Sequence, residues 1–318
     1  MTVKPEYKYP EKIVIGTRGS PLALVQANIV KDKIAKIGQN IDVTLRIIRT
    51  SGDWNPQGGE VRLEALEGGK AQFAKEIEEA LLSGEIDIAV HSMKDMETVL
   101  PEGLVIPFML PREDVRDAFI SEKASVISDL PQGAIVGTAS VRRQAFLLNK
   151  RPDLNVVPFR GNVQTRLDKL RDGQVDATFL ACAGLNRLGM ADEVTSAIEI
   201  DEMLPAVGQG AVGIEIRSSD VEGMSFISQF SCLKTYVCVE CERGVLRALG
   251  GSCHTPVGVH ATFDNGAIDL RVKVVSLDGT QCWSDEETGV CNGVNDAISL
   301  GERVGVRLKG IVPDGVLG

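Results

Sequence analysis

Four short segments place arginine or lysine beside small polar residues, after an apolar run and before an amphipathic one. They are Thr17-Arg18-Gly19-Ser20, Ser92-Met93-Lys94-Asp95, residues 138–143 and Arg160-Gly161-Asn162. In each segment we predict that a strand ends and a helix begins, so that free backbone N–H groups and the positive end of a helix dipole meet a cationic side chain. Together these turns predict an anion-binding cleft, although each one alone is more typical of an ordinary helix cap with solvated basic residues.

Arginine outnumbers lysine in and around these turns. The arginines concerned are Arg18, Arg142, Arg143, Arg160, Arg166 and Arg187. A planar guanidinium binds a carboxylate through two parallel hydrogen bonds, which a lysine cannot do. Since the chain as a whole carries a net charge of −10, this local concentration of arginine favours a ligand that bears several carboxylates.

Asp95 is the single acid within a basic turn. Neighbouring cations favour the ionised form of a carboxyl group, so Asp95 could stabilise a positive charge that develops on a substrate. The alternative is that Asp95 merely caps a helix. His91, at the end of the preceding predicted strand, is either catalytic or, more typically for such a position, a packed and hydrogen-bonded histidine.

Cys253 lies in the turn-rich segment 250–256, where an accessible thiol would be a candidate nucleophile or attachment point. The odd number of seven cysteines argues against a disulfide framework. A zinc site is an alternative, with ligands drawn from Cys232, Cys238, Cys241, Cys253 and His254. Because the chain has no second CxxC pair and Cys238 and Cys241 fall on a predicted helix, we expect no metal.

Alternating strands and helices are predicted to position these turns. Apolar runs at 13–15, 43–48, 86–90, 134–136, 155–159 and 177–180 alternate with helical patterns. Such alternation predicts parallel sheets, with ligands bound at the carboxyl ends of the strands. Pro101, Pro107 and Pro111 mark a connection between two units, and the Gly-rich segment 51–69 is predicted to be a long loop. After residue 230, turns at Asp264-Asn265-Gly266 and Asp278-Gly279 and a closing helix over 297–308 predict a smaller α+β domain with an antiparallel sheet.

Composition limits the classes of protein that fit. A chain of 318 residues predicts two or three domains, and 43% hydrophobic with 25% charged residues excludes a disordered or fibrous protein. No apolar run approaches the ~20 residues that a membrane-spanning helix needs. The acidic balance and the 4% aromatic content argue against nucleic-acid binding. The polar N-terminus contains no secretory signal, so we expect a cytoplasmic protein.

Six segments together resemble the porphobilinogen deaminase family, also called hydroxymethylbilane synthases. They are GTRGSPLALVQA (16–27), VHSMKD (90–95), GTASVRRQ (137–144), FRGNVQTRL (159–167), LPAVGQGAVGIE (204–215) and ERGVLRALGGSCHTPVG (242–258). The resemblance implies a transferase of tetrapyrrole (haem and chlorophyll) biosynthesis. Its substrate would be porphobilinogen, of which four molecules are condensed head to tail with loss of ammonia. The growing chain would be held on a covalent dipyrromethane cofactor and released by hydrolysis as hydroxymethylbilane.

The resemblance also implies a fold and a division into domains. Two α/β domains of the periplasmic-binding-protein type would surround a cleft, with a smaller α+β C-terminal domain beside them. Domain 1 would comprise residues 1–110 with 211–228, domain 2 residues 111–205, and domain 3 residues 230–318. A monomer is the family expectation.

Site residues follow from the matched motifs. Asp95 would be the catalytic carboxylate, and Cys253 would form the thioether to the dipyrromethane. The residues that would bind cofactor or substrate are Arg18, Ser20, Ser92, Lys94, Thr138, Ser140, Arg142, Arg143, Arg160, Arg166, Arg187 and Gln209. Lys70 would lie in a lid.

The sequence departs from the family pattern at several positions. Ala71-Gln72 stands in place of Gly-Leu after Lys70, Ala139 in place of a serine, and Met96-Glu97 in place of an apolar residue and proline. The first change lies in the predicted lid, the second removes one possible hydroxyl contact, and the third would add an acid near Asp95. A non-enzymatic anion binder of the periplasmic type and a zinc-dependent regulator are the competing interpretations.

Overall fold

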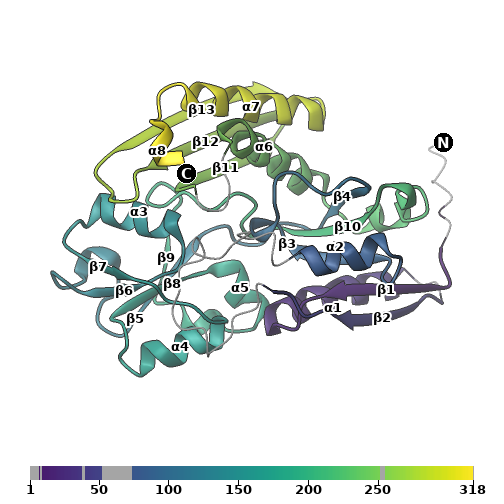
Figure 1. Ribbon diagram of the computed structural model, residues 1–318, viewed down its shortest axis with the longest axis horizontal. Helices are drawn as coiled ribbons and strands as arrows, with labels where there is room; N and C mark the ends of the chain where they lie inside the picture. Colours follow the sequence, from purple (N-terminus) through teal and green to yellow (C-terminus); the bar gives the residue numbers. More distant parts are fainter. Residues whose placement is uncertain (1–6, 8, 38–39, 52–73, 251–254, 318) are drawn as a thin grey trace.

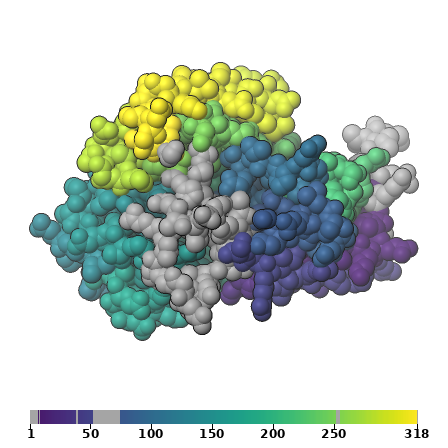
Figure 2. All heavy atoms as spheres, viewed as in Figure 1, coloured from purple at the N-terminus to yellow at the C-terminus, as the bar shows by residue number. Residues whose placement is uncertain are grey.

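The chain is described here as a computed structural model that covers residues 7, 9–37, 40–51, 74–250 and 255–317. Two α/β units lie side by side, and a third unit packs across both of them (Figure 1). The space-filling view shows the first unit in purple and blue, the second in teal and the third mainly in yellow (Figure 2).

The first sheet has the strand order β2-β1-β3-β10-β4. Its strands are β1 (Lys12–Thr17), β2 (Asp42–Ile47), β3 (Ile88–Ser92), β4 (Leu104–Met109) and β10 (Val212–Arg217). Helices α1 (Pro21–Ala35) and α2 (Lys75–Leu82) pack on it. The start of α1 is as predicted, because Ser20 is its N-cap and Pro21 its first residue. Ala27, Val30 and Ile34 share a buried cluster with β1.

The second sheet has the order β7-β6-β8-β5-β9. Its strands are β5 (Asp117–Ser121), β6 (Ile135–Gly137), β7 (Asn155–Val157), β8 (Ala177–Ala181) and β9 (Ser196–Ile198). Its helices are α3 (Val141–Lys150), α4 (Val163–Arg171) and α5 (Cys182–Arg187). Helix α3 begins within the predicted basic segment 138–143, and α4 begins directly after Arg160-Gly161-Asn162.

Both sheets are mixed, which corrects the prediction of parallel sheets. β10 runs antiparallel to β3 and β4, and β5 runs antiparallel to β8 and β9. The physical reason is that the chain leaves the first sheet after β4 and returns to it as β10. The unit between therefore starts with β5, which runs against the other four strands of the second sheet.

The third unit is the predicted antiparallel sheet with helices. β11 (Val257–Asp264), β12 (Ala267–Val275) and β13 (Cys282–Val290) form a meander. Asn265 and Gly266 have positive φ angles of 48° and 77°, as the predicted tight hairpin requires. Helices α6 (Leu233–Leu249) and α7 (Val294–Lys309) cover one face of this sheet, and the short α8 (Asp314–Leu317) follows. Short 3-10 helices are η4 (Met93–Asp95), η5 (Ile127–Asp129), η6 (Ala191–Glu193), η7 (Ser218–Asp220) and η8 (Ser225–Gln229).

Two segments connect the first unit with the second: residues 110–116 after β4, and residues 199–211, the returning crossing, before β10. An ion pair joins these two crossings to the third unit. Arg112, in the segment after β4, donates to both carboxylate oxygens of Glu242 on α6 at 2.7 and 3.0 Å. Its Nε donates to the carbonyl of Gln209 in the returning segment, at 2.9 Å. Glu242 also accepts the Gly208 N–H at 2.8 Å. This pair therefore fixes both crossings at one point.

The strands of the three sheets fall within the three predicted residue ranges. The division into domains stays a prediction. Within the described residues, no helix is both long and apolar enough to cross a bilayer.

Candidate functional site

A pocket lies at the carboxyl ends of β1 and β3, where the sequence predicts a ligand. It is lined by Arg18, Ser20, Leu22, Ala23, Gln26, Ala74, Val90, His91, Ser92, Asp95 and Met96. β1 and β3 are parallel neighbours, so the two turns that follow them meet at one edge of the sheet. The structure thus brings together four of the predicted site residues: Arg18, Ser20, Ser92 and Asp95.

Tight packing around Met93 holds Asp95 in place. Asp95 is the last residue of η4, so the alternative that it caps this helix is wrong. Met93, only 2% exposed, anchors η4 in the core, and its N–H donates to the Ala211 carbonyl at 3.0 Å. A Cβ atom on Gly213 would lie 2.3 Å from the Met93 Sδ, and one on Gly208 would lie 2.9 Å from the Met93 Cβ. Glycine at both positions therefore allows the close approach that positions the aspartate.

Gln26 is a pocket residue that the sequence reasoning missed. It lies on α1, is 2% exposed, and its Nε2 donates to the Ser92 Oγ at 2.9 Å. In the sequence, Gln26 is a polar residue among the apolar residues of the buried face of α1, and this pattern could have identified it. Ser20, by contrast, already uses its Oγ to accept the Ala23 N–H at the start of α1.

His91 is packed and hydrogen-bonded. It is 7% exposed, and its Nε2 lies 2.9 Å from an oxygen of Glu215, a fully buried residue on the neighbouring strand β10. Glu78 on α2 belongs to the same group of charges. Burial, with repulsion from Glu215, raises the pKa of Glu78 to about 7.

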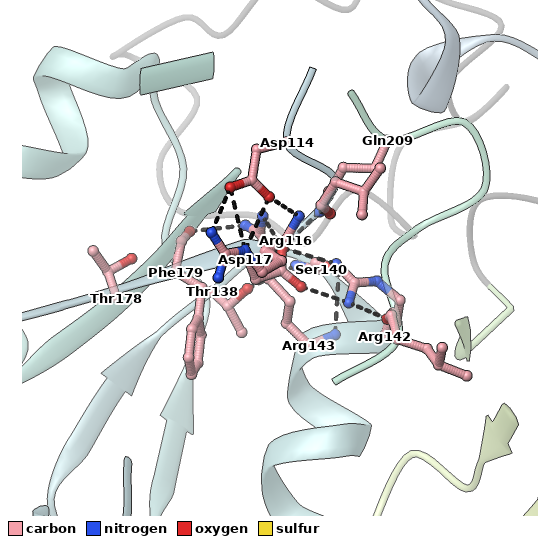
Figure 3. A network of polar contacts seen from close by, with 12 residues as sticks. Asp114, Arg116, Asp117, Thr138, Ser140, Arg142, Arg143, Thr178, Phe179 and Gln209 are labelled. Atoms are coloured by element: carbon pink, nitrogen blue, oxygen red, sulfur yellow. Dashed lines mark hydrogen bonds and ion pairs between the residues drawn. The ribbon is translucent and has the colours of Figure 1, made fainter. Parts of the chain in front are cut away.

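Two arginines in the first turn of α3 form a buried network (Figure 3). Arg142 and Arg143 are 4% and 5% exposed and both donate to Asp117, the first residue of β5. Gln209 reaches the same carboxylate at 3.1 Å. The structure thus brings three predicted site residues together around an acid that the sequence reasoning did not identify. Nothing local marks Asp117, because its partners lie 25 or more residues away in the chain.

The charges in this network stabilise one another. Burial alone would raise the pKa of Asp117, but the guanidinium groups of Arg142 and Arg143 outweigh it and hold that pKa well below its usual range. Burial also lowers the pKa of Arg143, which Asp117 opposes. Asp117 is therefore an anion at neutral pH.

Two hydroxyl groups order the turn. The Thr138 Oγ1 accepts the Ser140 N–H at 3.1 Å, and the Ser140 Oγ accepts the Arg143 N–H at 3.4 Å, as an N-cap does. Both hydroxyls therefore accept backbone N–H groups at the start of α3.

Of the four remaining predicted cations, three lie around the second sheet and one, Lys94, lies in the first unit. Arg160 is 8% exposed, and its carbonyl accepts a hydrogen bond from Lys169. The Arg166 Nε donates to the Gly161 carbonyl at 2.8 Å. Arg187 donates to the Gly210 carbonyl at 2.7 Å, which links α5 to the returning crossing. Lys94 lies on η4 beside Asp95.

Several residues that the sequence singles out lie outside the described residues. They are Cys253, His254, Lys70, Gln72 and residues 52–69 of the predicted loop. The flanks of the cysteine segment are described. α6 ends at Gly250, whose φ of 68° is left-handed. Thr255 is buried and donates to the Leu317 carbonyl at 2.8 Å.

The CxxC pair lies within the core of the third unit. Cys238 and Cys241 are 4% and 0% exposed on α6. Burial raises the pKa of Cys238 to about 12, and both cysteines belong to the apolar cluster that α6 forms with the sheet. Among the described residues, no group of three or more His, Cys, Asp or Glu side chains is arranged to hold a metal ion.

Comparison with known proteins covers nearly the whole chain. Residues 13–225 match the family model "Porphobilinogen deaminase, dipyromethane cofactor binding domain", and residues 236–310 match "Porphobilinogen deaminase, C-terminal domain". The porphobilinogen deaminase of Nitrobacter hamburgensis is 50% identical over 92% of this chain and 94% of its own. That of Paracoccus denitrificans is 47% identical over 98% of both chains. The chloroplastic one of Oryza sativa is 48% identical over 93% of this chain and 83% of its own. This chain therefore belongs to the porphobilinogen deaminase family.

Proposed function

We propose that this chain is a transferase that condenses four porphobilinogen molecules into hydroxymethylbilane. The observation that carries the proposal is the match of both family models, in order, over residues 13–225 and 236–310. In each condensation the bond between the aminomethyl carbon and nitrogen breaks, and that carbon joins the free α-carbon of the pyrrole chain. Ammonia leaves, the α-carbon loses its proton, and water finally releases the tetrapyrrole.

The residues of the second unit fit a cofactor that carries carboxylates. Two buried guanidinium groups face the single carboxylate of Asp117, and the buried Nε of Arg142 has no partner among the described residues. When bound, a dipyrromethane supplies the free pyrrole α-carbon for the first condensation. The residues that would hold its carboxylates, and those of the growing chain, are Lys94, Arg142, Arg143, Arg160, Arg166, Arg187 and Gln209, with Thr138 and Ser140 as polar contacts.

Asp95 would supply the electrostatic part of the chemistry. When ammonia leaves, positive charge spreads over the pyrrole ring, and a fixed carboxylate stabilises that charge without reorganising. Arg18, which lines the same pocket, would bind a carboxylate of the incoming monomer, and Ser20 and Ser92 would contact its polar groups. Lys70 would act in a lid over the cleft.

The covalent link tests the proposal most directly. We propose that Cys253 forms the thioether, and we expect the purified chain to exceed its sequence mass by two deaminated porphobilinogen units. Intact-mass spectrometry measures this, and Cys253→Ser should remove the added mass. The matched control is Cys282→Ser, which changes an exposed cysteine on β13 and should keep it. An unmodified wild-type chain that does not consume porphobilinogen would instead favour a simple anion-binding protein.

The finer assignments of a monomer and of a cytoplasmic location are also proposals. Light scattering during size-exclusion chromatography tests the first, and fractionation of the source cells tests the second.

A further inference from the structure

Asp117 is the most heavily bonded side chain at the arginine pair. Its Oδ2 accepts from the Arg142 Nη1 at 2.7 Å. Its Oδ1 accepts from the Arg142 Nη2, from the Nε and Nη2 of Arg143, and from the Gln209 Nε2, at 2.8–3.1 Å. Figure 3 shows these side chains converging on the carboxylate from α3 and from the returning crossing. One buried acid thus orients three of the predicted ligand-binding side chains.

The charges at this point do not balance within the described residues. Two guanidinium groups, on residues 4% and 5% exposed, meet one fully buried carboxylate. The neighbouring Arg116 pairs with two acids, Asp114 and Glu199, whose side chains are 25% and 72% exposed, so the balance of the buried charges is counted without this group. One positive charge is therefore in surplus, and the Arg142 Nε is a buried donor without an acceptor among the described residues. Buried charges and buried donors normally have partners, so this arrangement fits an anionic ligand.

We propose that Asp117 is a positioning and specificity-determining residue. Its carboxylate is the permanent counter-ion of Arg142 and Arg143, and it leaves this pair with the charge to bind one singly charged carboxylate. The proposed function is needed only to identify that carboxylate as an acetate or propionate of a pyrrole.

The ligand shares the arginines with Asp117 and does not displace it. Displacement would leave a fully buried carboxylate without its partners, which is costly. The other edges of the two guanidinium groups are also fixed, since Arg142 donates to the Leu204 carbonyl and Arg143 to the Phe179 carbonyl, both at 2.8 Å. The incoming carboxylate therefore uses the remaining N–H groups of a pair that is already oriented.

The charge of Asp117 also determines which anion the arginine pair prefers. A singly charged carboxylate brings the cluster to neutrality, whereas a dianion such as sulfate leaves a buried negative charge in excess. Without the charge of Asp117 the pair would carry two positive charges, and the dianion would be the better match. Removing this one charge should thus reverse the anion preference.

The test is the anion dependence of thermal unfolding in Asp117→Asn. The full chain is produced in cells that cannot make porphobilinogen, and unfolding midpoints are titrated with acetate and with sulfate at constant ionic strength. For the wild type we expect acetate to raise the midpoint more than sulfate. For Asp117→Asn we expect the reverse, with the ratio of the two affinities changed by about tenfold or more, since one unit charge at close range is altered.

Two further variants complete the experiment. Asp153→Asn removes the acid of the Arg151–Asp153 pair, outside the network, and should keep the wild-type preference. Asp117→Asn combined with Arg142→Gln restores a surplus of one charge and should again prefer acetate, and it tests the proposal if the single variant does not fold. An unchanged preference in Asp117→Asn, or a sulfate preference in the double variant, would overturn the proposal. Because no porphobilinogen is used, neither result depends on the proposed enzymatic function.

Discussion

At the scale of single residues, the structure divides the predicted site residues into a set that lines the pocket of the first unit and a set that surrounds a buried acid. Arg18, Ser92 and Asp95 line one pocket, whereas Arg142 and Arg143 are engaged with Asp117. Local patterns predict the first set, because turn residues after a strand are adjacent in sequence. They cannot reveal Asp117 or Gln26, because the partners of these side chains come from distant elements.

Replacement of Asp95 should abolish most of the turnover without unfolding the chain. Asp95→Asn keeps the size of the side chain and removes the charge that would stabilise the cationic pyrrole. We expect kcat to fall by about 10²–10³-fold, the range seen when one preorganised electrostatic group is lost. Steady-state assays with porphobilinogen measure it, and circular dichroism checks the fold. Asp129→Asn, at the end of η5, is the control, and wild-type turnover in Asp95→Asn would exclude the proposed role.

Glu78 should make stability depend on pH near neutrality. Its pKa rises from an ordinary 4.5 to about 7, first through burial and then through Glu215 and Glu97, while His91 opposes the shift. The folded chain therefore holds this proton more tightly than the unfolded chain does. The resulting stability is complete below pH ~4.5 and is lost as the pH rises through about 7.

Glu78→Gln, which carries no charge at any pH, should therefore be more stable than the wild type at pH ~8. We expect a difference of about 1–2 kcal/mol, reduced from the full shift because the side chain is only partly buried. Urea unfolding at pH ~5.5 and ~8 measures it. A difference that does not shrink at the lower pH would contradict the assignment.

At the scale of elements, helix starts and hairpins could be predicted and some strands could not. Ser20-Pro21 marks the start of α1 and Asn265-Gly266 marks the turn between β11 and β12, because both depend on local backbone geometry. The three prolines suggested a connection where β4 lies. Pro107 is nevertheless inside β4, which is possible because β4 is an edge strand and pairs only with β10. The local sequence does not show that β4 lies at the edge of the sheet, because the order of the strands depends on the tertiary fold.

The crossing of α6 and α7 gives an element-scale prediction. A Cβ on Gly301 of α7 would lie 2.0 Å from the Cys241 carbonyl oxygen on α6, which is backbone and cannot move aside alone. Gly→Ala usually stabilises an exposed helix position by about 1 kcal/mol, but overpacking costs about 1–3 kcal/mol and should prevail here. We expect Gly301→Ala to lower the free energy of unfolding in urea. Gly315→Ala, at an exposed position of α8 where a Cβ meets nothing within 4 Å, should leave it unchanged or raise it by up to ~1 kcal/mol. Equal stabilities of the two variants would refute the close packing.

At the scale of the whole molecule, the Arg112–Glu242 pair joins three units that the sequence shows only as separate patterns. Arg112 is in one crossing, Gln209 and Gly208 are in the other, and Glu242 is on α6, which leads toward Cys253. Glu242 also accepts the Ala261 N–H of β11 at 2.9 Å. The unit that carries the proposed attachment cysteine is thereby held against the two segments through which the α/β units are connected.

Breaking this pair should weaken the entire chain. Glu242→Gln keeps the shape of the side chain but leaves the guanidinium of Arg112, a side chain only 12% exposed, without a counter-charge. We expect the free energy of unfolding to fall by about 3–5 kcal/mol, the cost of removing one partner from a buried ion pair. The matched control is Arg46→Gln, whose partner Glu85 is as exposed as Arg46 itself at 52%, and it should cost less than ~1 kcal/mol. Urea unfolding followed by circular dichroism compares them. A loss in Glu242→Gln no larger than in Arg46→Gln would mean that the crossings are held by apolar packing alone, and the third unit would then not depend on this pair for its position.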